Sequence, residues 1–396
     1  MRIVYFQFVP HYGGAARSCV EFCRRLSEHV DVSIVDPYGT AEMYGEAIRN
    51  AGLDYHVLCP DQKQSYIGGH GNPLSRALRI GKALPDLLGV RRRAAQVLGE
   101  LQPSVVCSDS FKSGVLMQTC LSLRSIPLVL YLRGWYTPEK MPWYGKWLCR
   151  KRAAMVWAVS RATEGALRCA GVDPRRIRVL HNPIDVDASI ARAKRPFDAE
   201  PPQMDRPVRI LLPAGIMRAK GQHTAVDALA RLVADGYDPV LWIAGDHQAI
   251  GKNKHYVDEV RALAVSLGVT DRVEWLGLRH DVPQLMNAAT VVTLPSHTEG
   301  HPRVILEAMS LARPIAATPV GGIQDMIMPE VTGLLFEVDD AEGLARCIRR
   351  FADDPADAGR MGRQGQDYIR RCFRMEQQTE KALAFLRQAA EKEPGR

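Results

Sequence analysis

The sequence lacks the features of a membrane-spanning or exported protein. Among its 396 residues, no apolar run approaches the ~18 that a spanning helix needs. Residues 2–9 are too few for a secretory leader and carry no small-residue cleavage site, so they favour a strand. The nine cysteines are an odd number without a Cys-x-x-Cys pair, which argues for reduced thiols and against a disulfide framework or a zinc site.

Two nucleotide-related signatures are also missing. Neither half of the chain holds Gly-x-Gly-x-x-Gly followed by a ribose-binding acid, which argues against a nicotinamide-dependent oxidoreductase. No recognised nucleic-acid-binding module is present, so nucleic acid is not an expected partner. The sequence requires no metal ion, and we expect none.

The two halves of the chain open with the same pattern. Residues 2–9 form a hydrophobic, β-rich run that is followed by Gly13-Gly14, a helical periodicity and a second strand at 30–35. The second half repeats this order, with strands expected at 208–212 and 240–244. Strand–turn–helix–strand units are typical of parallel sheets, so we predict an α/β protein.

The length exceeds what one hydrophobic core usually serves, which favours two domains. A polar, proline-rich stretch at 193–207 is the expected linker. We therefore predict an N-terminal Rossmann-like domain over residues 1–195 and a second Rossmann-like domain over residues 205–375.

The charge is unevenly distributed between the halves. Residues 1–200 hold 28 Lys and Arg against 18 Asp and Glu, a net of +10; residues 201–396 hold 24 against 26, a net of −2, and the two sum to the whole-chain +8. The basic first half therefore suggests an acidic partner such as an anionic lipid or a phosphorylated acceptor.

Aromatic and basic residues are interleaved between positions 135 and 152. Such a mixture suits the headgroup layer of an anionic membrane, which would place the protein in the cytoplasm at the inner face of the membrane. The alternative is a helix that packs its aromatics inward and exposes a basic face to water. The residues are Trp135, Tyr136, Lys140, Trp143, Tyr144, Lys146, Trp147, Arg150, Lys151 and Arg152.

The stretch 295–325 carries the strongest functional pattern. A strand-like run leads into a polar turn and then an apolar-periodic segment, with Pro302 suited to the first helical position. Glu299 lies in the turn and Glu307 follows eight residues later, so both carboxylates could face one cleft. The N-terminus of such a helix offers free N–H groups and a partial positive charge to a ligand phosphate.

This stretch resembles the nucleotide-sugar site of retaining family 4 glycosyltransferases (glycosyl transferase group 1), which have the GT-B fold of two Rossmann-like domains facing a cleft. The resemblance rests on the Glu-x7-Glu spacing, the flanking Pro-Ser, the Glu-Ala-Met at Glu307 and the later Val320-Gly-Gly. It implies that Glu299 and adjacent amides hold donor-sugar hydroxyls and that Glu307 accepts hydrogen bonds from the ribose. It also implies a helix at about 376–396 that crosses back to the first domain.

The loop 214–222 resembles the phosphate loop of the family, in which an arginine and a lysine grip the diphosphate. Lys220-Gly221 matches, whereas Gly215 stands where the family has its arginine. Either Arg218 substitutes or one cationic contact is missing. Two cations would stabilise the charge that develops on the leaving group. The alternative interpretation is an exposed Lys-Gly turn.

The resemblance assigns roles residue by residue. Glu299, Lys220 and Arg218 are the expected catalytic residues, and Gly13, Arg133 and Trp135 are expected on the acceptor side. Arg133-Gly134 replaces the His-Asp or His-Gly of many relatives, so Arg133 binds an acidic acceptor, binds the donor phosphate or caps the sheet. His301 either helps at the sugar or packs in its loop. The expected donor-binding residues are Gly14, Gly215, Arg218, Lys220, Gly277, Glu299, Gly300, His301, Pro302, Arg303, Val304 and Glu307.

The implied reaction moves a sugar from a UDP- or GDP-sugar to a glycan or lipid-linked acceptor with retained anomeric configuration, in the synthesis of a cell-surface polysaccharide. The departing phosphate oxygen would take the proton of the acceptor, with no metal and no cofactor besides the donor substrate. The departures at Gly215 and Arg133 keep open a catalytically silent sugar- or polymer-binding relative. A nicotinamide-dependent oxidoreductase is the weaker alternative.

Overall fold

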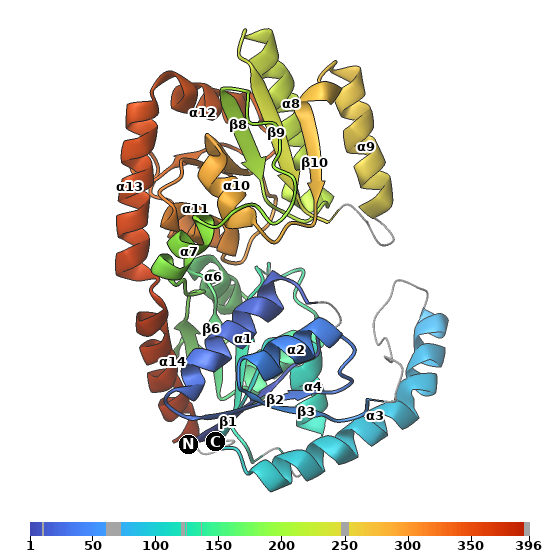
Figure 1. The fold of residues 1–396 in the computed structure, drawn as a ribbon. Helices are drawn as coiled ribbons and strands as arrows, with labels where there is room; N and C mark the ends of the chain where they lie inside the picture. Colours follow the sequence, from blue (N-terminus) through green and yellow to red (C-terminus); the bar gives the residue numbers. More distant parts are fainter. Residues whose placement is uncertain are drawn as a thin grey trace. The chain divides into compact units, whose positions relative to one another are not determined.

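The chain forms two compact units (Figure 1). The first comprises Met1–His181 and Met375–Arg396, and the second Asn182–Arg374. Residues 182–195 thus lie in the second unit, whereas the sequence analysis drew the boundary between 195 and 205. The computed structural model describes residues 1–9, 12–60, 73–119, 123, 125–135, 137–246 and 253–391.

The first unit is built on a parallel sheet with the strand order β3-β2-β1-β4-β5-β6-β7. Apart from Arg2 at the start of β1, its central strands are buried, as expected for a parallel sheet that is covered on both faces. The strands are β1 (Arg2–Phe6), β2 (Asp31–Asp36), β3 (Asp54–Val57), β4 (Val105–Ser108), β5 (Leu128–Leu132), β6 (Met155–Ala158) and β7 (Ile177–Val179).

Helices cover both faces of this sheet. The alternation of side chains along β1 sends Ile3 and Tyr5 into one hydrophobic core and Val4 and Phe6 into another. The C-terminal helix joins the first of these cores through Leu386 and its neighbours, so the end of the chain completes the N-terminal unit. The helices are α1 (Gly14–Ser27), α2 (Glu42–Asn50), α3 (Pro73–Leu101), α4 (Phe111–Thr119), α5 (Trp143–Trp147), α6 (Arg161–Cys169) and α14 (Met375–Ala390).

The second unit repeats the plan with a parallel sheet of order β10-β9-β8-β11-β12-β13. The predicted α/β class with two Rossmann-like sheets is confirmed. Its strands are β8 (Val208–Leu212), β9 (Pro239–Ala244), β10 (Val273–Gly277), β11 (Val291–Leu294), β12 (Ile315–Ala317) and β13 (Leu334–Leu335). Its helices are α7 (Val186–Ala193), α8 (Gln222–Ala234), α9 (Asn253–Ser266), α10 (Val282–Ala288), α11 (Arg303–Ser310), α12 (Ala341–Asp353) and α13 (Pro355–Cys372).

The strand order reverses direction between β8 and β11, which are hydrogen-bonded neighbours. The loops that follow these two strands therefore leave the sheet toward opposite faces and open a crevice at the carboxyl edge, where open α/β sheets bind their ligands. The loop after β8 carries Lys220, and the loop after β11 carries Glu299. Among the described residues, no helix is long and apolar enough to cross a bilayer.

Candidate functional site

Gly221 fixes the path of the loop after β8. Its φ of +70° lies in the left-handed region that favours glycine, and a Cβ at this position would meet the carbonyl oxygen of Pro295 at 2.0 Å. Only glycine therefore lets this loop lie against the end of β11. The preceding residues form a 3-10 turn, Arg218–Lys220, which delivers the side chain of Lys220 to the same edge of the sheet.

Lys220 and Glu299 meet at this edge. The ammonium of Lys220 donates to Glu299 Oε1 at 2.6 Å, and the hydroxyl of Ser296 donates to the same oxygen at 2.8 Å. Glu299 is only 8% exposed, so its carboxylate is held by a cation and a hydroxyl instead of by water. Within the described part of the chain, no hydrogen bond engages Oε2, which leaves this oxygen to accept from a ligand hydroxyl.

The second carboxylate of the predicted pair lies inside helix α11. Glu307 approaches Arg303 one turn earlier, with 3.6 Å between Oε1 and Nη2, and both side chains are largely buried. Pro302 was predicted at the first helical position, but the helix begins one residue later, at Arg303, and Pro302 is the residue that precedes it. Val304 is half-buried in the first turn. Glu299 thus lies in the loop that leads into α11, and the Arg303–Glu307 pair lies in the first turns of this helix.

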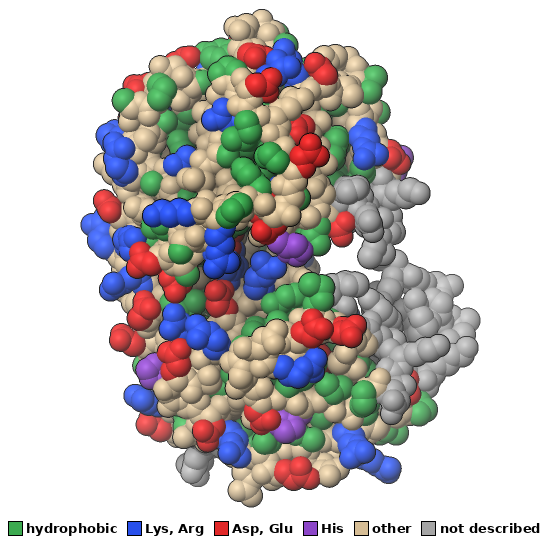
Figure 2. Space-filling view, in the orientation of Figure 1, with side chains coloured by type: hydrophobic (Ala, Val, Ile, Leu, Met, Phe, Trp, Pro, Cys, Tyr) green, Lys and Arg blue, Asp and Glu red, His purple; other side chains and the backbone are tan. Residues whose placement is uncertain are grey.

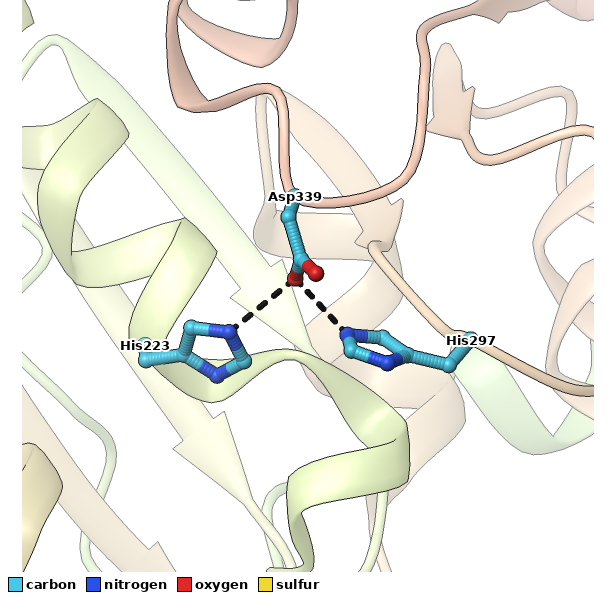
Figure 3. A group of neighbouring side chains, drawn as sticks. All are labelled: His223, His297 and Asp339. Atoms are coloured by element: carbon cyan, nitrogen blue, oxygen red, sulfur yellow. Dashed lines mark hydrogen bonds and ion pairs between the residues drawn. The ribbon is translucent and has the colours of Figure 1, made fainter.

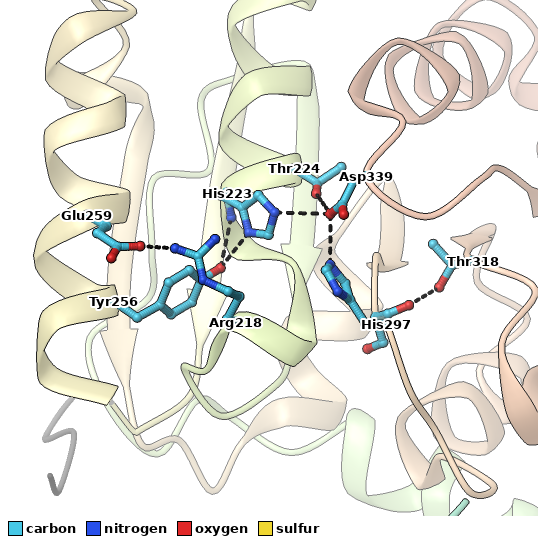
Figure 4. A network of polar contacts seen from close by, with 9 residues as sticks. Arg218, His223, Thr224, Tyr256, Glu259, His297, Thr318 and Asp339 are labelled. Carbon is cyan, nitrogen blue, oxygen red and sulfur yellow. Dashed lines mark hydrogen bonds and ion pairs between the residues drawn. The ribbon is translucent and has the colours of Figure 1, made fainter. Parts of the chain in front are cut away.

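Arg218 extends toward Tyr256 and Glu259 of α9 (Figure 4). Its guanidinium lies 5.1 Å from the centre of the Tyr256 ring and pairs with Glu259 on α9. The side chain is 62% exposed. Arg218, the predicted second cation of the phosphate loop, therefore lies against α9 in this structure. To contact a bound diphosphate, its side chain would have to leave Glu259.

Two other predicted glycines border the same edge. Gly215 is exposed and accepts a hydrogen bond from the side-chain amide of Gln222 at 3.0 Å. Gly277 ends β10 with a φ of +66°. The turn after Gly277 is fixed by a buried ion pair in which Arg279 donates twice to Asp281, both bonds 2.7 Å long.

His301 is 3% exposed and packs in its loop. Its ring centre lies 5.2 Å from that of Phe373, and its backbone carbonyl accepts a hydrogen bond from the side-chain amide of Asn182 at 2.7 Å. Gly300, immediately before it, is half-buried. This geometry agrees with the packing interpretation of His301.

In the first unit, the predicted glycines mark the start of α1. Gly13 precedes the helix and Gly14 begins it, and no heavy atom of another described part of the chain lies within 4 Å of a Cβ built at either position. The backbone here is therefore open to a ligand that approaches the helix N-terminus. The predicted residue Trp135 is half-buried.

Arg133 follows β5 and lies over the ring of Tyr131, with 4.2 Å from its guanidinium carbon to the ring centre. Nearby, the amide of Gln7 donates to Asp109 and the hydroxyl of Tyr44 donates to Gln7. Burial raises the pKa of the Asp109 carboxyl, although the charge of Arg133 and the bond from Gln7 oppose this. The sequence analysis missed Asp109, which follows β4 beside β1 at the switch point of this sheet.

The aromatic and basic stretch is partly exposed. Trp143 and Trp147, four residues apart on α5, are 79% and 40% exposed. Lys140 and Lys151 are exposed nearby, whereas Arg150 donates to the carbonyl of Ala170 at 2.6 Å. Of the other predicted aromatics, Tyr144 packs against the core of the first unit, Trp135 is half-buried, and Tyr136 lies outside the described residues. The two tryptophans thus project outward and do not follow the inward-packing alternative.

One Asp-x-Asp triplet, a pattern that often binds metal in transferases, does occur at positions 185–187. Asp185 caps α7 by accepting from the backbone N–H of Ala188 at 2.9 Å, and Asp187 pairs with Arg370 at 2.8 Å. Both carboxylates therefore take part in local structure of the second unit.

Comparisons with known proteins agree with this geometry. Residues 12–188 match the model of Glycosyltransferase Family 4, and residues 195–368 match that of Glycosyl transferases group 1. The chain belongs to glycosyltransferase family 4. The second matched segment includes the β8/β11 switch point and the loops that carry Lys220 and Glu299.

Curated relatives of this family 4 member are also glycosyltransferases. A lipopolysaccharide core biosynthesis glycosyltransferase of Rhizobium meliloti is 29% identical over 54% of this chain and 58% of its own. A 2-deoxystreptamine glucosyltransferase of Streptomyces kanamyceticus is 28% identical over 63% and 64%. The chain thus spans between half and two-thirds of the length of these relatives.

Solved structures show the fold. Anabaena HepE in complex with UDP has a TM-score of 0.79, with 21% identity over 98% of this chain and 100% of that one. The lipopolysaccharide outer core galactosyltransferase WaaB has a TM-score of 0.70, with 18% identity over 98% and 99%. The GT-B fold predicted from the sequence is confirmed.

Proposed function

We propose that the protein transfers a sugar from a UDP- or GDP-sugar to a glycan or lipid-linked acceptor. The observation that carries this proposal is the Lys220–Glu299 pair at the β8/β11 switch point of the second unit. A cation and the N-terminus of α11 at this edge suit a diphosphate, and a carboxylate with one oxygen engaged suits a sugar hydroxyl. Complexes of HepE with UDP and with UDP-glucose support a nucleotide-sugar donor.

In the proposed mechanism, the residues position the donor and stabilise the leaving group. Lys220 and the α11 amides balance the negative charge that grows on the diphosphate as the glycosidic bond breaks. Glu299 orients the hydroxyls of the sugar, and Glu307 accepts from the ribose. The acceptor hydroxyl attacks from the side of the departing phosphate, whose oxygen takes its proton, so the anomeric configuration is retained and no metal ion is needed.

We further propose that the acceptor belongs to a cell-surface polysaccharide or a lipid-linked precursor and meets the first unit near Gly13 and Arg133. Similarity to a lipopolysaccharide core enzyme and to a colanic acid enzyme of Salmonella typhimurium, 26% identical over 55% of this chain, supports this setting. The exposed Trp143 and Trp147 beside basic residues support work at the cytoplasmic face of an anionic membrane.

The test is a turnover assay with UDP- and GDP-sugars in which release of the nucleoside diphosphate is measured with and without acceptor extracts. We expect the wild-type protein to release the nucleoside diphosphate. The variant Glu299→Gln should lose turnover but still bind the nucleotide. The matched control is Glu342→Gln, which removes an exposed charge from the same unit. No turnover by the wild-type protein with any donor, together with nucleotide binding, would favour the silent sugar-binding relative.

A further inference from the structure

Three side chains that the proposed mechanism does not use converge on one point in the second unit (Figure 3). Nε2 of His297 lies 2.7 Å and Nε2 of His223 lies 3.1 Å from the same oxygen of Asp339, Oδ1. All three ligand-type atoms lie within 4.8 Å of one another. Two imidazole nitrogens and one carboxylate oxygen this close together are a typical donor set for a transition-metal ion.

Each of the three residues comes from a different loop or helix end at the edge of the sheet. His223 lies in the first turn of α8, His297 in the loop after β11, and Asp339 in the loop before α12. His297 and Asp339 are 42 residues apart, and His223 and Asp339 are 116 residues apart. No spacing motif in the sequence could therefore have predicted the cluster.

The backbone around His297 is held firmly. Its N–H donates to the carbonyl of Ala219 at 2.9 Å, and the hydroxyl of Thr318 donates to the carbonyl of Ser296 at 2.6 Å (Figure 4). Asp339 has a φ of +62°, a left-handed conformation that is uncommon for residues other than glycine. The loops thus aim both side chains at the common point before any ligand is present.

The other ring nitrogen of His223 has a fixed partner. Nδ1 lies 2.8 Å from the hydroxyl of Tyr256, which also accepts from the backbone N–H of His223 at 3.2 Å. When Nδ1 carries a proton and donates it to Tyr256, the lone pair of Nε2 points at Asp339. Metal-binding histidines characteristically use their second nitrogen in this way, because the outer hydrogen bond fixes the tautomer.

The charge at the site favours a cation. The anionic carboxylate of Asp339 faces one nitrogen of each imidazole. The lone pairs of these nitrogens and of the carboxylate oxygen repel one another unless a proton or a metal ion lies between them.

We propose that His223, His297 and Asp339 bind a divalent transition-metal ion of the zinc class. Ligand bonds of about 2.0–2.1 Å in a tetrahedron place ligand atoms roughly 3.3 Å apart, so small side-chain rotations open the present hydrogen-bonded cluster to the ion. Two nitrogen ligands favour zinc, cobalt or nickel over magnesium and calcium, which prefer oxygen. A water molecule would complete the fourth position.

The ion would connect the start of α8, the loop after β11 and the loop before α12. The loop after β11 also carries Glu299, two residues beyond His297. The role of the ion is therefore structural: it fixes the loop that presents Glu299, while Lys220 remains the cation for the diphosphate. This inference does not depend on the identity of the donor or on turnover.

The test uses the full-length protein, stripped with a chelator and then titrated with Zn²⁺ by calorimetry and with Co²⁺ by visible absorption. We expect one ion per chain and the strong absorption of tetrahedral Co²⁺. His297→Ala and Asp339→Asn should weaken binding by more than the roughly 10–100-fold that losing an outer partner costs. His255→Ala, which removes an exposed histidine of α9, is the matched control and should bind as the wild-type protein does.

Two further variants make the result decisive. Tyr256→Phe keeps all three ligands and should weaken the affinity by roughly 10–100-fold, a loss that only an outer-partner role explains. In the double variant His223→Ala/His297→Ala, any ion uptake that remains takes place elsewhere on the chain. The proposal is overturned if this double variant binds as tightly as the wild-type protein, or if the wild-type dissociation constant exceeds about 0.1 mM. Melting curves of the metal-free variants verify that each is folded.

Discussion

At the scale of single residues, Gly221 determines where Lys220 is placed. The position combines a left-handed φ of +70° with a carbonyl oxygen 2.0 Å from where a Cβ would be. The left-handed conformation alone costs about 1–2 kcal/mol for a residue with a side chain. The close approach to Pro295 adds a second cost, because the atom in the way is backbone.

We therefore predict that Gly221→Ala lowers the free energy of unfolding by clearly more than the roughly 1–2 kcal/mol of the conformational cost alone. The matched control is Gly268→Ala, because Gly268 has a φ of +68° but no heavy atom within 4 Å of its Cβ position. Urea unfolding of both variants measures the difference. Equal losses in the two variants would show that the contact with Pro295 does not constrain the loop.

A second residue-scale prediction concerns the buried Arg279–Asp281 pair, whose side chains are 7% and 0% exposed. Asp281→Asn leaves the guanidinium without its anion and should destabilise the protein by about 3–5 kcal/mol at neutral pH. Asp227→Asn, which breaks a half-exposed helical pair with Arg231, should cost less than about 1 kcal/mol. Similar losses in the two variants would contradict the burial argument.

The pH dependence of this pair follows from the direction of the pKa shift. Burial opposes ionisation of Asp281, but hydrogen bonds from Arg279 and from the backbone of Asp198 outweigh it, so the pKa is lowered in the folded state. The stabilisation is thus complete above the unfolded value of about 3.9 and is lost as the pH falls through the lower folded value. The stability gap between wild type and Asp281→Asn should be constant from pH 7 to 5 and narrow in stronger acid.

The sequence located several of these residues but not their contacts. Lys220 and Glu299 were each found through a local pattern, yet they are 79 residues apart, and only the β8/β11 pairing brings them together. The preference of Arg218 for Glu259 on α9 depends on tertiary structure and could not be anticipated. The same holds for Asp339, whose partners come from two other loops.

At the scale of elements, buried strands were the most predictable parts. β8 has the bounds 208–212 that were expected from its hydrophobic run, in which only Arg209 is polar, because a strand covered on both faces is largely apolar. Helix α7 was not predicted; it ends at Ala193, where the expected linker begins. Its cap by Asp185 is a local signal that could have revealed it.

An element-scale prediction concerns α5. If its outward tryptophans enter a membrane surface, Trp143→Ala/Trp147→Ala should reduce binding to anionic vesicles by about tenfold or more, since burial of one large apolar side chain contributes about 1.5–3 kcal/mol. Sedimentation with anionic and neutral vesicles measures this effect. Met43→Ala removes an exposed apolar side chain from α2 of the same unit and serves as control. Unchanged binding of the double variant would refute membrane contact through α5.

At the scale of the whole molecule, the repeated sequence pattern predicted two parallel sheets, and both have the same order of strands about a central switch point. The excess of basic residues in the first half did not indicate where on the molecular surface a partner would bind. On the face drawn in Figure 2, basic and acidic side chains are interspersed and do not form one basic patch. Charge counts along the sequence therefore indicated a kind of partner but not a surface.

The central claim is that the second unit binds a nucleoside diphosphate through Lys220 and the N-terminus of α11. Thermal melting with UDP, GDP, ADP and NAD, each with and without Mg²⁺, tests it most directly. A ligand at about 100 times its dissociation constant adds about 2.7 kcal/mol to the free energy of unfolding. The account predicts a shift with one diphosphate, equal with and without Mg²⁺ and reduced in Lys220→Met. No shift with any diphosphate, or a shift with NAD alone, would contradict it.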